Sequence, residues 1–199
     1  METLTTMTAN DSATAVPTVP GVVAGCWAID PAHSNIAFSV RHLMVSKVRG
    51  QFTRFEGMIQ ITAEPADASV MATIDLTSVD TRNDDRDAHL RSADFFDVER
   101  HPTMTYRSTG VRPTVDGYGV SGELCLHGVT RPVELALEFN GVSPDPWGGT
   151  RAGFSATTEI NRRDFGIDIS LPLAGGGVVV GDKVKVSLEI EAVLQTSQP

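Results

Sequence analysis

The chain has 199 residues, of which 41% are apolar, and its formal net charge is −9. This length and apolar content suit one domain of ordinary size with a buried core. The negative charge argues against a surface that binds nucleic acid. No run of 18 apolar residues occurs, so no integral membrane segment is predicted.

The first 25 residues are rich in Thr, Ala, Ser and Pro, and they predict a disordered tail ahead of a folded domain at residues 26–195. Residues 23–26 resemble the cleavage site of a bacterial lipoprotein. However, no Lys or Arg precedes Arg41, and Pro17 and Pro20 interrupt the apolar content that a signal peptide needs. We therefore expect a cytoplasmic protein rather than an exported one, and leave open whether the cysteine of that segment is ever lipidated.

Cys26 and Cys125 are the two cysteines of the chain. Two thiols that belong to no CxxC pair cannot build a disulfide framework. We therefore expect both to be free, which suits a reducing compartment.

Apolar and polar residues alternate with a period of two through most of the chain. In the first such segment Ile36, Phe38 and Val40 share one face, and mostly polar residues occupy the other. Successive side chains of a strand point to opposite faces, so each segment predicts an antiparallel strand with one covered face. Eight strands are predicted: 34–43, 49–63 with a bend at Gly57, 68–77, 103–112, 117–127, 131–142, 149–161 and 183–194.

Eight strands with little helix between them indicate an all-β sandwich or barrel. Eight is also the number at which a closed barrel has room for packed side chains or one small ligand, and closure removes exposed edges. Several positions on the inward faces are small, which favours a cavity over a filled interior. These positions are Gly57, Ala63, Ala72, Gly122, Ala152 and Ala156.

Residues 81–92 break the alternation and predict a short helix. Thr81 or Asn83 can cap its N-terminus, acidic residues fill its first turn, and Arg91 stands near its C-terminus. The adjacent Phe95 and Phe96 need a place to be buried, which we expect at one mouth of the barrel. A second short helix or turn is predicted at residues 161–166, and a mobile loop at 171–181.

No catalytic, metal-binding or cofactor-binding motif is recognisable, so no catalytic residue, metal or cofactor is predicted. The five histidines show no HxxxH or HExxH spacing. His42 has an inward phase and is expected to be a core histidine. His33 fits a turn before its strand, His101 is expected to be exposed, and His127 to point outward from a turn.

Six segments, in chain order, resemble sequence blocks of the YceI family of bacterial lipid-binding proteins. The most specific is SVDTRN (78–83) with RDAHLRSADFF (86–96). The others are DPAHSNIAF (30–38), GQF (50–52) with FEG (55–57), LHGVTRPV (126–133), DPWGGTRAGF (145–154) and NRRDFG (161–166). Together they span about residues 27–194.

The resemblance implies an eight-stranded antiparallel lipocalin-like barrel with a short helix and an elongated apolar interior cavity. Its members bind polyisoprenoids, isoprenoid quinones, prenyl phosphates or similar long amphiphiles. From strand phase and position we predict that thirteen residues bind the ligand: Ile36, Phe38, Val40, His42, Phe52, Ile74, Phe95, Phe96, Leu124, Leu126, Leu137, Phe154 and Phe165. Arg86, Asp87, His89 and Arg91 are expected to form a polar network that pins the helix to the barrel.

The leading hypothesis is thus a protein that binds, sequesters or transports a long-chain isoprenoid or similar lipid. Two alternatives stay open. One is an enzyme or stress-linked factor of isoprenoid or quinone metabolism, for which His42 is the clearest acid or base. The other is a structural barrel without a ligand. The oligomeric state also stays open, a homodimer included.

The composition of the tail generates a first prediction. Limited proteolysis should remove residues 1 to about 25 and leave a stable core of about 19 kDa, because unfolded, polar termini are cut first. Mass spectrometry identifies the cut, and thermal unfolding compares the core with the whole chain. A trimmed core that unfolds would contradict the assignment of these residues to a dispensable tail.

Overall fold

The computed structural model describes residues 23–43, 45–146, 148–169 and 179–195. Its strands are β1 (Gly25–Ile29), β2 (Asn35–His42), β3 (Ser46–Phe52), β4 (Phe55–Ile61), β5 (Ser69–Asp75), β6 (Val79–Asp80), β7 (Thr103–Thr114), β8 (Gly117–Leu126), β9 (Val129–Pro144), β10 (Thr150–Asn161) and β11 (Val180–Leu194). The helices are α1 (Asp84–Arg91) and the 3-10 helices η1 (Pro65–Asp67), η2 (Leu76–Ser78) and η3 (Arg162–Phe165).

Parts of two predicted segments lie outside these residues: positions 1–22 of the tail and 171–178 of the loop. Within the described residues, no helix has the length and apolar character needed to cross a bilayer.

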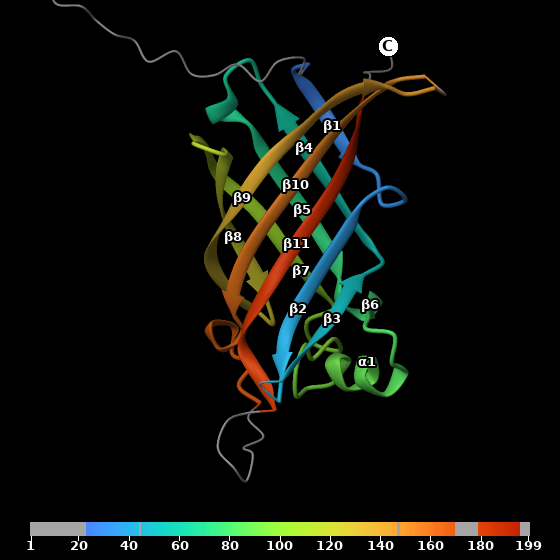
Figure 1. The fold of residues 1–199 in the computed structure, drawn as a ribbon, viewed down its shortest axis with the longest axis vertical. Helices are drawn as coiled ribbons and strands as arrows, with labels where there is room; N and C mark the ends of the chain where they lie inside the picture. The colour runs from blue at the N-terminus through green and yellow to red at the C-terminus, as the bar shows by residue number, and fades with distance from the viewer. Residues whose placement is uncertain (1–22, 44, 147, 170–178, 196–199) are drawn as a thin grey trace, which may run out of the picture.

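The strands form one antiparallel sheet that closes into an elongated barrel (Figure 1). The order around the barrel is β1-β4-β5-β7-β8-β9-β10-β11, and β11 pairs with β1 to complete the circuit. β11 also pairs with β2 along its N-terminal part, so β1 and β2 lie against it one after the other. The predicted eight-stranded barrel is therefore confirmed. At some of its eight positions, two strands that follow each other in the chain take the place of one long strand, as β1 and β2 do beside β11.

One predicted strand, 49–63, is interrupted at a different place from that expected. β3 ends at Phe52 and β4 begins at Phe55, because the intervening backbone bonds elsewhere. Thr53 N donates to Ser78 O (3.2 Å), and Arg54 N donates to Ser78 Oγ (3.0 Å). Gly57, where we predicted the bend, instead gives room to a neighbour: a Cβ there would stand 2.6 Å from Ile29 Cδ1.

The first strand, β1, was not predicted from the sequence, because its five residues are too few to show alternation. It nevertheless carries Trp27, which is wholly buried. Trp27 packs with Ala152, Phe154 and Ala192 in a cluster of its own. The folded region thus begins within the stretch assigned to the tail, at Gly25 or just before it.

Helix α1 covers one end of the barrel, where β6 pairs with β3 but not with β7 (Figure 1). Asn83 caps the helix by accepting from Arg86 N (2.8 Å). The buried Asp87 accepts from Thr81 N (3.0 Å) and Oγ1 (2.5 Å), and Arg91 Nη1 donates to Thr77 O (3.2 Å). These bonds tie the helix to the residues on either side of β6, as expected for Asp87 and Arg91, whereas His89 pairs with Asp94 (2.9 Å) and lies outside this network. We call this end the α1 end and the opposite one the η1 end.

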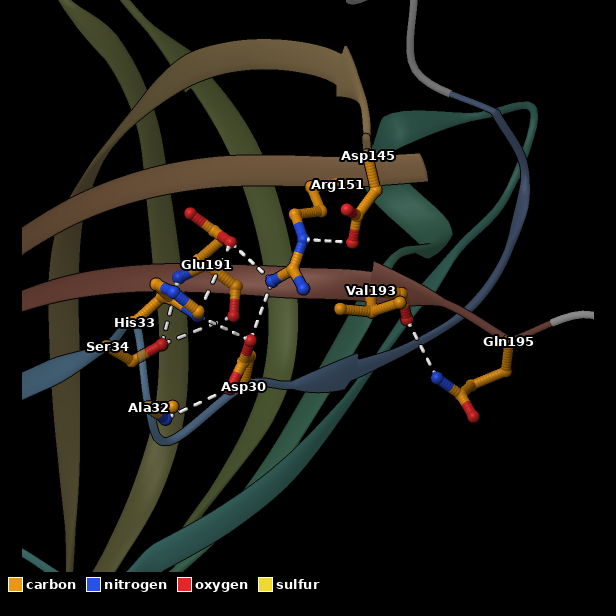
Figure 2. A network of polar contacts seen from close by, with 9 residues as sticks. All are labelled: Asp30, Ala32, His33, Ser34, Asp145, Arg151, Glu191, Val193 and Gln195. Atoms are coloured by element: carbon orange, nitrogen blue, oxygen red, sulfur yellow. Dashed lines mark hydrogen bonds and ion pairs between the residues drawn. The ribbon is translucent and has the colours of Figure 1, made fainter. Parts of the chain in front are cut away.

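Near the η1 end, Arg151 of β10 draws together three carboxylates from separate segments (Figure 2). Its Nη1 donates to Asp30 Oδ2 (2.6 Å) and Glu191 Oε1 (2.5 Å), and its Nε donates to Asp145 Oδ2 (2.6 Å). Arg151 thereby joins the β1–β2 corner, the β9–β10 hairpin and β11. This contact lies where β11 pairs with β1 and closes the barrel. Arg151 foremost, and His33 next, hold the pKa of Asp30 at about 2, below its ordinary value of 3.8.

Replacing Arg151 by Met should lower the free energy of unfolding at pH 7 by about 1–3 kcal/mol, because three carboxylates lose their shared partner. Denaturant unfolding measures the change. Arg112→Met is the matched control: Arg112 pairs with one carboxylate, Glu134, and both side chains are exposed, so little loss is expected.

The wild type and Arg151→Met also show how the stabilisation by this network depends on pH. A carboxyl group whose pKa is lowered by folding stabilises the protein above its unfolded pKa, and this contribution is lost as pH falls through the folded value. The wild type should therefore lose the Asp30 contribution between about pH 4 and pH 2. The difference in free energy of unfolding between the wild type and Arg151→Met should decrease over that pH range. A difference that stays constant down to pH 2 would show that the network does not stabilise the fold electrostatically.

Candidate functional site: two cavities inside the barrel

A cavity of about 500 Å³ occupies the η1 end and the middle of the barrel. Its walls are aliphatic and aromatic side chains from the barrel strands, such as Ile74, Leu135 and Leu188. The polar side chains of the lining are those of Thr62, Ser69, Thr158, Tyr106 and Tyr118. Among the described residues no charged side chain lines it, so the surface of the cavity is mostly apolar and uncharged.

A second cavity of about 440 Å³ lies at the α1 end, between the barrel and the helix. Apolar side chains such as Phe95 and Phe96 line it together with charged and ionisable ones. The latter are Arg41, His42, Asp85, Arg86, His89 and Arg162. Ile160 borders both cavities, so they adjoin along the barrel. Together they form a long apolar interior with a polar, mostly basic end.

The small inward residues explain only part of the free space. Ala63, Ala72 and Ala156 line the η1-end cavity, as the sequence predicts. The other three do not contribute to it. Ile29 fills the space beside Gly57, the ring of Tyr106 lies against Gly122, and Ala152 is packed beside Trp27.

Tyr106 is the ionisable group deepest in the apolar wall, and it is 7% exposed. Its hydroxyl donates to Val120 O (2.9 Å). Burial, with a smaller contribution from the negative charge of Glu134, raises its pKa to about 12. The hydroxyl is therefore protonated near neutral pH, with its proton in use, and it does not provide a general base.

The basic groups at the α1 end fall into two kinds. Arg162 is buried and committed to the structure, because it donates to Ile167 O (2.5 Å), Gly181 O (3.1 Å) and Asp182 Oδ1 (2.8 Å). Its burial lowers the pKa of the guanidinium, which Asp182 opposes. Arg41 and His42 line the cavity without a side-chain hydrogen bond to any other described residue. These two are the basic groups of the cavity wall that are free to meet a polar part of a ligand.

The structure places eleven of the thirteen predicted ligand-binding residues on a cavity wall. Five line the η1-end cavity: Ile36, Ile74, Leu124, Leu137 and Phe154. Six line the α1-end cavity: Phe38, Val40, His42, Phe95, Phe96 and Leu126. Phe52 and Phe165 line neither cavity, and a contact of either with a ligand stays a prediction. Phe52 is enclosed between the rings of Phe38 and Phe96, and Phe165 is 1% exposed in the packed core.

Several wall residues were missed that strand phase could have identified. Met104 and Tyr106 share a face of the predicted strand 103–112, and both line the η1-end cavity. His101 also differs from expectation, because it is half-buried and its ring lies 5.2 Å from that of His127. Nothing in the spacing of these two histidines indicates that they meet.

Comparison with known proteins gives one family over most of the chain. A family model described as a YceI-like domain matches residues 27–192. A UPF0312 protein of Ectopseudomonas mendocina is 40% identical over 177 residues, which are 87% of this chain and 90% of that protein. The crystal structure of the Campylobacter jejuni YCEI protein is 28% identical, with a TM-score of 0.66 over 78% of this chain and 90% of the other.

A polyisoprenoid binding domain from Saccharophagus degradans has the same fold, with a TM-score of 0.66 over 87% of this chain and all of that chain. The identity between the two is 19%, so the likeness concerns the fold alone.

Replacing Leu124 by Trp tests whether the η1-end cavity is empty space. Leu124 lines the cavity on β8, and its neighbour Glu123 is exposed on the outer face of the same strand. In a packed core the added bulk typically costs about 1–3 kcal/mol. In the cavity the larger ring has room, so we expect Leu124→Trp to unfold within about 1 kcal/mol of Glu123→Trp on delipidated protein.

Leu76→Trp supplies the opposite reference, because Leu76 is wholly buried and lines neither cavity. It should be the least stable of the three variants. If Leu124→Trp is destabilised as strongly as Leu76→Trp, the barrel interior is a filled core and not a cavity.

Proposed function

This chain belongs to the YceI-like family, and we propose that it binds a long-chain isoprenoid or similar amphiphilic lipid within its barrel, to sequester or carry it. One observation carries the proposal: two adjoining cavities run along the barrel, and the larger has no charged side chain on its described walls. A ligand that matches such an interior is long, apolar and narrow. The polyisoprenoid binding domain from Saccharophagus degradans, which shares the fold, supports the same class of ligand.

The energetics favour a long chain over a compact ligand. Each methylene moved from water to an apolar wall contributes about 0.8 kcal/mol, so affinity increases with the length of chain enclosed. The strands position aliphatic side chains such as Val120, Leu137 and Leu188 along that path. An extended hydrocarbon chain can contact all of them in turn, whereas a compact molecule contacts only one region.

The polar character of the α1 end suggests the orientation of the ligand. Arg41 and His42 border the α1-end cavity, while the η1-end cavity is lined by apolar and uncharged side chains. We expect a polar or anionic head group at the α1 end and the hydrocarbon tail beyond Ile160. Prenyl phosphates and isoprenoid quinones both have this layout, and the experiment below distinguishes them by mass.

The chemistry of the walls gives less support to an enzyme. Catalysis on an isoprenoid needs an acid or base beside the reacting atoms. Tyr106 is held protonated by burial, and the other polar groups on the described η1-end walls are one further tyrosine and the hydroxyls of Ser and Thr. His42 at the α1 end is the remaining inward candidate that sequence analysis named. We therefore propose binding without turnover.

Solvent extraction of the purified protein, followed by mass spectrometry, tests the proposal. The wild type should release a long-chain isoprenoid or another lipid in an amount approaching one per chain. Leu124→Trp should release much less, because its ring occupies space that the chain needs, and Glu123→Trp should release as much as the wild type. Wild-type protein that neither releases a lipid nor takes up an added polyprenyl phosphate or quinone would refute the proposal.

A further inference from the structure

Three side chains of types that can bind a metal ion lie close together at the α1 end, outside both cavities. Asp97 and His101 belong to the segment between α1 and β7, and His127 belongs to the turn between β8 and β9. A donor atom of each lies within 4.8 Å of donor atoms of the other two. None of the three side chains lines either cavity, so the lipid site does not account for their arrangement.

We propose that Asp97, His101 and His127 form a binding site for a divalent transition-metal ion of the Zn²⁺ type. Two imidazole nitrogens and one carboxylate oxygen are donors that zinc accepts, whereas Ca²⁺ and Mg²⁺ prefer oxygen donors alone. Donors bound to tetrahedral zinc at about 2.1 Å lie about 3.4 Å apart, so small side-chain rotations bring the three to coordination distance. Three protein ligands leave a fourth position for water.

The histidine tautomer required for coordination is set by a second contact. His127 Nδ1 lies 3.2 Å from the carbonyl oxygen of Phe165. A carbonyl oxygen only accepts hydrogen bonds, so Nδ1 carries the proton and the lone pair of the neutral ring is on Nε2. A histidine ligand commonly donates its other N–H to a carbonyl or carboxylate in this way.

The carboxylate of Asp97 is buried with weak compensation. The residue is 9% exposed, and among the described residues its carboxylate makes one ion pair, with Arg100, whose Nη1 lies 3.4 Å from Oδ2. The Arg100 side chain is 77% exposed, so it can leave the carboxylate for solvent at small cost. A buried carboxylate favours a nearby cation, and a metal ion would supply a stronger one than this long contact.

The backbone holds the second histidine in place. His101 N donates to Asp97 O (2.8 Å), which turns the segment so that its ring lies beside the carboxylate. On the other side the ring lies against Gly128, where a Cβ would stand 2.6 Å from His101 Cε1. Within the described residues, the His101 ring nitrogens have no hydrogen-bond partner, so they are available to a metal ion.

A similar trio near the η1 end, Asp30, His33 and Glu191, provides a contrast. There the guanidinium of Arg151 already donates to both carboxylates, at 2.6 and 2.5 Å. A metal ion would have to displace a half-buried, multiply bonded cation. The proposal therefore concerns the Asp97 trio alone.

The test uses the full chain without an affinity tag, freed of metals with a chelator that is then removed. Calorimetric titration with Zn²⁺ should show one saturable site per chain. Zn²⁺ at 100 times its Kd should raise Tm by about 5–10 °C, because binding to the folded state alone shifts the unfolding equilibrium. Asp97→Asn and His127→Asn should each weaken binding at least tenfold. Asparagine tolerates the positive φ of both positions, 48° and 52°.

His89→Gln is the matched control, because His89 is a histidine of the same end that pairs with Asp94 outside the trio. It should bind Zn²⁺ as the wild type does. A second measurement uses the wild type alone, so it does not depend on whether a variant folds. Zn²⁺ should protect His101 and His127 from modification by diethylpyrocarbonate, while His89 stays reactive. Absence of a one-to-one site, undiminished binding by Asp97→Asn and His127→Asn, or equal protection of all three histidines would overturn the proposal.

Discussion

Closure of the sheet is the constraint on which the rest of the structure depends. Only a sheet without free edges can enclose an apolar interior that its own side chains do not fill, because open edges would admit water and other chains. β11 provides the closure by pairing with β1 along one part and with β2 along another. Arg151 secures the corner between those two strands.

Two densely packed clusters of side chains compensate for the stability that the cavities do not provide. Trp27, Ala152 and Ala192 form a compact cluster near the η1 end, and a larger one around Phe52, Leu76 and similar residues lies toward α1. The walls of a cavity lack dispersion contacts, so the fold must obtain stability from such clusters and from the backbone hydrogen bonds between neighbouring strands.

Alternation predicted an all-β sandwich or barrel and most of its inward faces, because side-chain direction in a strand follows directly from position. The closed lipocalin-like barrel was implied by the resemblance to the YceI family. It could not show that Phe52 would be enclosed by other rings, since phase gives direction but not depth. The trio of Asp97, His101 and His127 was also invisible, because β8–β9 pairing and an irregular segment bring it together. A site on the inward faces of strands can be predicted from the sequence, because alternation shows which residues face inward. A site formed by turns and irregular segments that are distant in the chain has no such pattern.

The register that closes the barrel has a consequence for how the molecule is made. Trp27 pairs with Leu194, so the first described strand finds its partner in the last. Contacts between residues so far apart in the chain are slow to form, because a large loop must close before they stabilise anything. During synthesis the early strands therefore wait with an apolar face and an unpaired edge, which is the state most prone to aggregation. The barrel can therefore close only after β11 has been translated, because β11 supplies the partner of β1.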